Sequence, residues 1–139
     1  MPLHRIYSPV GTLSSEEKAL IAKNLTAVYV ERGLPPFYVD VVFLDIPKDS
    51  FYVGGEQRTI VRVVSQHLAR TTPKELYQAI LDRVEGAFAP LFRERGLEWE
   101  FHIEQHEREL WRIQGFNPPP SGSEGEKLWR EKNRAVPYE

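Results

Sequence analysis

At 139 residues the chain has the length of a single domain, and its contents of 41% hydrophobic and 27% charged residues are ordinary for a soluble globular protein. The formal net charge of −2 excludes the basic field that nucleic acid or an anionic membrane would need, so neither is expected as a partner. The absence of cysteine excludes disulfides, thiolate metal sites and cysteine nucleophiles. No apolar run has membrane-spanning length and the N-terminus lacks a signal-peptide pattern, so the cytoplasm is the expected compartment.

The first predicted element is a strand over the opening residues, MPLHRIYS, in which a proline directly follows the start methionine. Cells generally remove a start methionine when the next residue is small, and proline qualifies. Removal would leave Pro2 as a free secondary amine at the tip of the strand. Retention of Met1 would instead make the Pro2 nitrogen an amide without basicity. Pro2 is therefore a candidate reactive group whose state depends on processing of the chain.

A helix is predicted next, over residues 14–32. Ser14 and Glu17 fit a capping box at its start, and Gly33 suits the position just past its end. Strand-like segments flank this helix, LHRIYS before it and FYVDVVFLD after it. Apolar residues at helical spacing give the helix one buried face, formed by Ile21, Leu25, Val28 and Tyr29.

The second half of the chain repeats this plan. The stretch ERGL, which ends the first helical pattern at residues 31–34, recurs at residues 94–97. Before the second copy, Thr72, Pro73 and Glu75 predict an N-cap, a first-turn proline and a capping-box partner. Strand-like runs flank this helix too, RTIVRVVSQ before it and LEWEFHIE after it. Its apolar stripe and closing glycine are Tyr77, Ile80, Leu81, Val84, Phe88, Leu91 and Gly96.

Two β-α-β units in succession predict the fold. Each unit pairs its strands in parallel through a right-handed crossover, so the fold class is α/β (α+β), a four-stranded sheet with both helices on one face. The other face is then bare, and we expect another subunit to cover it. The apolar residues expected on that bare face include Val41, Phe43, Val61 and Val63.

The last part of the chain has a different character, so we divide the sequence into a double β-α-β domain over residues 1–116 and a tail over residues 117–139. The segment NPPPSGSEGE predicts a proline-rich loop, and a short capped helix could start at Ser123. Two alternatives stay open for this tail. It packs on the body or on a neighbouring subunit with Trp129 as anchor, or it is a loose end.

The segment VDVVFLDIPKDSFYVGG, Val39–Gly55, resembles the part of 4-oxalocrotonate tautomerase that ends in an aromatic residue and a Gly-Gly pair, here Phe51, Gly54 and Gly55. Together with the proline at position 2 and the β-α-β units, it makes the chain resemble the tautomerase superfamily. The length, the fused double unit and the stretch TIVRVV…LAR are more similar to the cis-3-chloroacrylic acid dehalogenase group. The resemblance implies a homotrimer, a small carboxylate substrate and no cofactor.

The resemblance also implies roles for particular residues. Pro2 matches the catalytic proline, and Arg70 matches the second of two arginines that bind the substrate carboxylate. The first of these arginines falls on His67, and the glutamate that prepares an attacking water falls on Arg112, with Glu109 close by. The group's helix histidine, apolar wall and last-strand tyrosine fall on Tyr29, Phe51 and Phe101, so the candidate substrate-binding residues are Tyr29, His67, Phe51, Phe101 and Arg112.

These residue types suit proton transfer. An α-amine has an ordinary pKa near 7.7–8.0, and burial or a cation such as Arg70 lowers that pKa, which favours the neutral, basic form. Pro2 could then move a proton within the enol of a 2-oxo acid while Arg70 holds the carboxylate. His102 and His106 are spaced for zinc only on a helix, and they lie in a strand-like run, so no metal site is expected.

We predict that the protein is an enzyme, a tautomerase, which is the first of three functions considered, and the other two stay open as alternatives. The first is tautomerisation of small 2-oxo acids, and the second is water addition by a cofactor-independent dehalogenase or hydratase of unsaturated acids. The third is a non-catalytic oligomeric binding module on the same fold. Chloride release or hydration of a haloacrylic or acetylenic acid would favour the second. Inertness toward 2-oxo acids together with a tight partner would favour the third.

Overall fold

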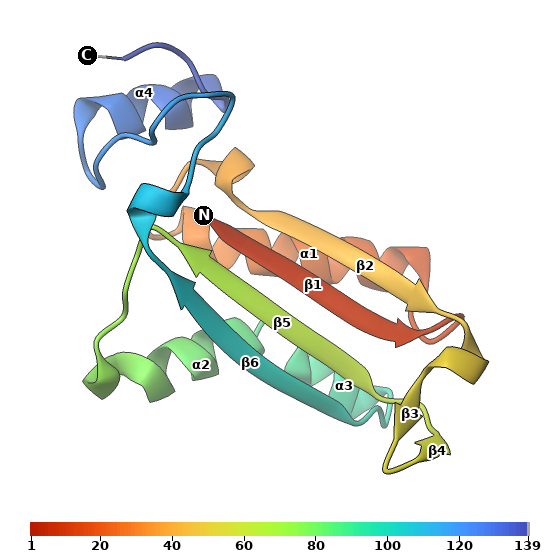
Figure 1. The fold of residues 1–139 in the computed structure, drawn as a ribbon. Helices are drawn as coiled ribbons and strands as arrows, with labels where there is room; N and C mark the ends of the chain where they lie inside the picture. The colour runs from red at the N-terminus through yellow and green to blue at the C-terminus, as the bar shows by residue number, and fades with distance from the viewer. Residues whose placement is uncertain (139) are drawn as a thin grey trace.

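The computed structural model describes residues 1–138, and its main sheet has four strands (Figure 1). The first unit consists of β1 (Pro2–Pro9), α1 (Ser15–Val30) and β2 (Asp40–Ile46). The second consists of β5 (Val61–Leu68), α2 (Tyr77–Glu85), α3 (Ala89–Glu94) and β6 (Trp99–His106). A small hairpin, β3 (Tyr52–Val53) and β4 (Glu56–Gln57), joins the two units. Single 3₁₀ turns lie at Pro36–Tyr38, Lys48–Ser50, Lys74–Leu76 and Arg108–Leu110, and the last helix is α4 (Glu124–Lys132).

The strands pair as the two predicted β-α-β units require. The order in the sheet is β2-β1-β5-β6, with β1 parallel to β2, β5 parallel to β6, and β1 antiparallel to β5. Helices α1, α2 and α3 cover one face of this sheet, and α4 lies beyond its end (Figure 1). Ile6, at the centre of β1, is fully buried and lies between Phe43 and Val63 in register. The predicted fold class is confirmed.

Helix α1 follows the sequence pattern closely. Ser14 caps it, and Ser14 and Glu17 make both hydrogen bonds of the capping box. Ile21, Leu25 and Tyr29 are its buried residues. The side chains of these three residues therefore attach α1 to the sheet.

The second predicted helix is interrupted. A 3₁₀ turn comes first, then α2, then the short α3, with Phe88 between the two helices at φ −132° and ψ −28°. Pro90 accounts for the break, because it has no N–H to bond the Gly86 carbonyl and is tolerated only in the first turn of a helix, where it lies in α3. The apolar stripe still reaches the core, since Val84, Phe88 and Phe92 are fully buried.

The four residues predicted to lie on the bare face of the sheet lie on the opposite face. Val61 and Val63 are fully buried under the helices, and Val41 and Phe43 pack against the same core. The register explains this result, because Val63 and Phe43 lie beside Ile6 and side chains alternate between the faces of a strand. The bare face carries the alternate residues, both apolar and charged, among them Leu3, Arg5, Tyr7, Val42, Arg62, Val64, Glu100, His102 and Glu104.

The tail packs on the body of its own chain. Ser123 caps α4, and Trp129 on that helix is fully buried. Its ring lies 5.9 Å from that of Phe37 and 6.1 Å from that of Tyr38, and its Nε1 donates to the Val136 carbonyl at 2.7 Å. Of the two alternatives, the anchored tail is the one the structure shows. Within residues 1–138 no helix is both long enough and apolar enough to cross a membrane.

Candidate active site

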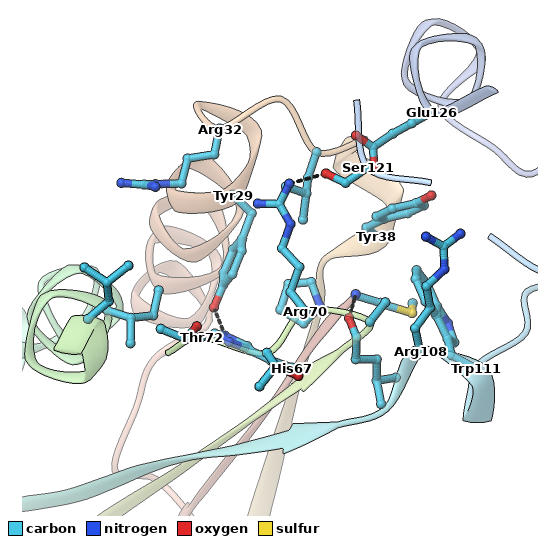
Figure 2. A pocket seen from close by; sticks show the side chains of 18 of the residues that line it. Tyr29, Arg32, Tyr38, His67, Arg70, Thr72, Arg108, Trp111, Ser121 and Glu126 are labelled. Atoms are coloured by element: carbon cyan, nitrogen blue, oxygen red, sulfur yellow. Dashed lines mark hydrogen bonds between the residues drawn. The ribbon is translucent and has the colours of Figure 1, made fainter. Parts of the chain in front are cut away.

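A cavity of about 280 Å³ lies where β1 begins and β5 ends. Its walls come from elements far apart in the sequence: the start of β1, the end of α1, the loop after β5, the start of α2, the turn after β6 and the tail (Figure 2). The polar and charged residues used below are Tyr29, Arg32, His67, Arg70, Arg83, Arg108, Ser121 and Glu126. The sheet brings these segments to one end of the molecule, and the tail closes the cavity from the side.

The terminal amine lies inside this cavity. In the chain with Met1 in place, the Met1 amine donates a hydrogen bond to the Leu68 carbonyl at 2.7 Å. Burial, and next the charge of Arg70, lower the pKa of this amine from 8.0 to about 5. Pro2 is buried directly behind Met1 and pairs with His67 across the β1–β5 ladder. Removal of Met1 would place the amine on Pro2 in the same surroundings.

Arg70 enters the cavity from the loop after β5. Ala69 precedes it with φ of 73°, a left-handed conformation that ends the strand and turns the chain. The guanidinium donates a hydrogen bond to the Ser121 hydroxyl of the tail (Figure 2). Arg70 therefore lies between the amine and the tail, where an anionic ligand would meet both the amine and the guanidinium.

The side chains of Tyr29 and His67 form a hydrogen bond. The Tyr29 hydroxyl lies 2.8 Å from Nε2 of His67, and the rings meet edge to face at 5.6 Å (Figure 2). Burial raises the pKa of the Tyr29 hydroxyl well above its ordinary value. Burial, with the terminal amine adding to it, lowers the pKa of His67 from 6.5 to about 4. At neutral pH both groups are uncharged.

The other three predicted site residues lie outside this cavity in the single chain. Phe51 precedes β3, at the end of the sheet opposite the N-terminus (Figure 1). Phe101 packs edge to face on Phe88 and lines a second cavity of about 380 Å³ between α2 and β6. Arg112 is exposed, because it follows the buried Trp111 in extended backbone and so points the other way.

Several lining residues were not singled out from the sequence, and five of them bear on the charge and polarity of the cavity. Arg32, Arg83 and Arg108 add cations to the wall, and the tail adds Ser121 and the buried Glu126. Oε1 of Glu126 accepts a hydrogen bond from the Gly122 N–H at 3.0 Å. No sequence signal pointed to the tail residues, because their position depends on how the tail folds back. With four arginines and one glutamate, the cavity favours an anionic ligand.

Metal ligands are not gathered here. Among the residues that the structure describes, no group of three or more His, Cys, Asp or Glu side chains has an arrangement that could hold a metal ion. His102 and His106 lie on β6 beside Glu104, on the bare face and away from the cavity.

Two β-α-β units side by side in one sheet, with a buried terminal amine beside an arginine, agree with the class that the family model defines, the tautomerase superfamily. The family model described as "Putative oxalocrotonate tautomerase enzyme" matches residues 1–134, and the chain belongs to this family. The comparison with curated proteins finds no match.

Solved structures agree with this assignment. A probable enzyme from the thermophilic fungus Aspergillus fumigatus is 41% identical, with 99% of this chain and 98% of that chain covered and a TM-score of 0.93. Native RhCC from Rhodococcus jostii RHA1 is 38% identical, with 98% and 99% covered and a TM-score of 0.91. N1, a member of the cis-3-chloroacrylic acid dehalogenase family, shares the fold at 18% identity, with 94% and 96% covered and a TM-score of 0.73. These likenesses support an enzyme of the superfamily without naming its reaction.

Proposed function

We propose that this protein is a tautomerase that interconverts the enol and keto forms of small 2-oxo carboxylic acids, with Pro2 as general base and Arg70 as carboxylate anchor. The observation that carries the proposal is the shared cavity of a buried terminal amine and the Arg70 guanidinium. Neither group alone would point to this reaction. A base and a cation across one small cavity match a substrate that has an acidic proton and a carboxylate.

The reaction requires Met1 to be removed, which leaves the Pro2 nitrogen with a lone pair. Burial and Arg70 would hold the pKa of that amine low, as they do for Met1, so it is neutral at pH 7. Neutral Pro2 takes the hydroxyl proton of the enol, and the O–H electron pair becomes the C2 carbonyl. The electrons of the C2–C3 double bond then take the proton back from the Pro2 ammonium at C3. Atoms and charge balance, and no cofactor takes part.

The charge of the cavity supports the substrate class. Arg70 would hold the carboxylate, and Arg32, Arg83 and Arg108 add positive potential along the same wall. A volume of about 280 Å³ suits a small acid.

The proposal includes a homotrimer. The face of the sheet without helices carries Leu3, Tyr7, Val42 and Val64 among charged residues, and Val42 is 45% exposed in the single chain. A second copy would cover this apolar surface. Trimers are described for two fused 4-oxalocrotonate tautomerases that share the fold at 16% and 17% identity.

The test is a pair of measurements on the purified protein. Intact mass establishes whether Met1 is absent. The rate of ketonisation of a phenylenolpyruvate-type enol is then compared between the wild type and Pro2→Ala, with Arg58→Ala as control, because Arg58 pairs with Glu98 outside the cavity. We expect Pro2→Ala to lose at least 100-fold in kcat/KM, within the usual range for a general base. Retained Met1, or an unchanged rate in Pro2→Ala, would overturn the mechanism.

One observation favours a second candidate, the addition of water to an unsaturated acid. Glu126 brings a carboxylate to the cavity from α4, although the position expected for a water-activating glutamate holds Arg112. In that reaction Glu126 would take a proton from water, and the oxygen would bond to C3. Pro2 would have to be in its ammonium form, in place of the neutral amine, to protonate C2, and the proton on Glu126 would return to Pro2 through solvent. Hydration of an acetylenic acid that is lost in Glu126→Gln, with ketonisation retained, would support this candidate.

A further inference from the structure

The pair formed by Tyr29 and His67 is the strongest unexplained feature of the cavity. His67 lies directly across the ladder from Pro2, and its side chain is on the same face of the sheet. Tyr29 reaches it from α1, and its hydroxyl is bonded to Nε2 at 2.8 Å (Figure 2). The resemblance implies that both residues contact the substrate, yet the Tyr29 hydroxyl is already hydrogen-bonded to His67.

The hydrogen bond determines which ring nitrogen of His67 carries the proton. The Tyr29 hydroxyl keeps its proton at neutral pH, because burial raises its pKa above the ordinary value of a tyrosine. Within residues 1–138, Nε2 of His67 is the one hydrogen-bond partner of this hydroxyl. If Nε2 carried a proton and donated, the buried hydroxyl hydrogen would have no acceptor, which is costly. Tyr29 therefore donates to Nε2, and the single ring proton of neutral His67 lies on Nδ1.

The surroundings keep the His67 ring neutral. The terminal amine and His4 face it from β1, Arg70 from the loop after β5, and Arg83 from α2. Each of these groups is cationic or able to become so, and no carboxylate contributes to the pKa of this ring. A protonated ring would lose its solvation in this buried position without gaining a carboxylate partner, so His67 acts as a neutral donor.

Nδ1 of His67 is available to a ligand. No hydrogen bond within residues 1–138 uses Nδ1, and it is not among the buried polar atoms that lack a partner, unlike Nε2 of His4. It therefore has open space beside it, and His67 lines the cavity. A ligand in this cavity would meet three groups together: the Pro2 amine, the Arg70 guanidinium and the His67 N–H.

We propose that His67 donates a hydrogen bond from Nδ1 to the C2 oxygen of the substrate, and that Tyr29 is a positioning residue that fixes this tautomer. This inference rests on the proposed tautomerisation and deepens it. The C2 oxygen carries the negative charge when Pro2 has taken the enol proton, so a donor fixed there stabilises that state more than the neutral enol. His67 does not transfer its proton, and Arg70 binds the carboxylate at the other end of the substrate.

The tautomer is measured first, without any assay of activity. Nitrogen NMR of the protein with ¹⁵N-labelled histidine distinguishes a protonated Nδ1 from a protonated Nε2. We expect Nδ1–H for His67 in the wild type and a shift of population toward Nε2–H in Tyr29→Phe. Tyr77→Phe is the matched control, because its hydroxyl lies by the second cavity, and it should leave the His67 tautomer unchanged. A wild-type ring protonated at Nε2 would overturn the inference.

Kinetics then test the role of the donor. An asparagine amide can place an N–H near the position of Nδ1, whereas a glutamine amide places it near Nε2. His67→Leu should lower kcat by about 100-fold with little change in KM, as expected for loss of one oxyanion donor. His67→Asn should recover at least 10-fold of that loss, and His67→Gln should not. Full activity in a folded His67→Leu, or equal rescue by both amides, would contradict the role.

A binding probe separates this inference from the proposed function. Oxalate resembles the enolate of a 2-oxo acid, and its binding should shift the Nδ1 resonance in the wild type. A protein that binds oxalate in this way but catalyses no ketonisation would refute the tautomerase and retain the His67 donor. A protein that ketonises the enol while oxalate leaves Nδ1 unshifted would retain the tautomerase and refute the donor.

Discussion

Trp129 holds the tail against the body, and its removal tests the link between the tail and the cavity. The side chain is fully buried among aromatic rings, the nearest being Tyr138 at 5.6 Å. Its Nε1 also donates to the Val136 carbonyl at 2.7 Å. Truncation to alanine would leave a large void in this cluster and an unpaired carbonyl at Val136.

The environment of Trp129 sets the expected loss in the free energy of unfolding. Trp→Ala in a core costs about 3–5 kcal/mol, including the lost hydrogen bond, so we take about 4 kcal/mol for Trp129→Ala. An unfolding entropy of about 2.1 cal/mol/K per residue gives about 0.29 kcal/mol/K for 139 residues, and hence a fall in Tm of about 14 °C. The amides of α4 should also lose protection from hydrogen exchange.

The assay combines thermal unfolding, hydrogen exchange and binding of a carboxylate. Leu110→Ala is the control, because Leu110 is 81% exposed and should change Tm by no more than about 2 °C, the effect of about 0.5 kcal/mol. Weaker carboxylate binding in Trp129→Ala is also expected, because the tail carries Ser121, the hydrogen-bond partner of Arg70. A Tm within 2 °C of the wild type, with α4 still protected, would refute the reasoning.

Three further outcomes are expected. Burial lowers the pKa of the His4 imidazole from 6.5 to about 3, so as pH falls the unfolded chain binds a proton at this ring before the folded protein does. The free energy of unfolding should therefore fall as pH drops from about 6.5 toward 3. In His4→Phe, Tm measured against pH should fall less steeply over this range. Arg70→Ala should raise the KM for a 2-oxo acid by about 10- to 100-fold through loss of a charged hydrogen bond. Arg70→Lys keeps the charge but not the paired donors of the guanidinium, so its KM should lie between those of the wild type and Arg70→Ala. An unchanged KM in Arg70→Ala would show that Arg70 does not bind the substrate. Val42→Asp, on the bare face, should lower the oligomeric state seen by light scattering, and an intact oligomer would show that this face is not the interface.

The candidate site was only partly accessible from the sequence. Pro2, Arg70, Tyr29 and His67 were proposed individually, and the structure places all four around one cavity, although their roles remain predictions. The sequence offered Tyr29 and His67 as two separate substrate contacts, because nothing in a linear pattern shows that a hydroxyl on a helix meets a ring on a strand. Ser121 and Glu126 could not be found, since a polar tail has no periodicity that says where it docks.

The sequence by itself determined the two β-α-β units, the start of α1 at its capping box and the start of α4 at Ser123, because these features depend on neighbouring residues and on local periodicity. Alternation along the strands also separated two sets of side chains, but both sets contain apolar residues, so the pattern alone did not say which set the helices cover. The pairing of Ile6 with Phe43 and Val63 decided this. Only the tertiary structure brought the tail to the cavity and joined Tyr29 to His67, because these contacts link residues 38 or more positions apart.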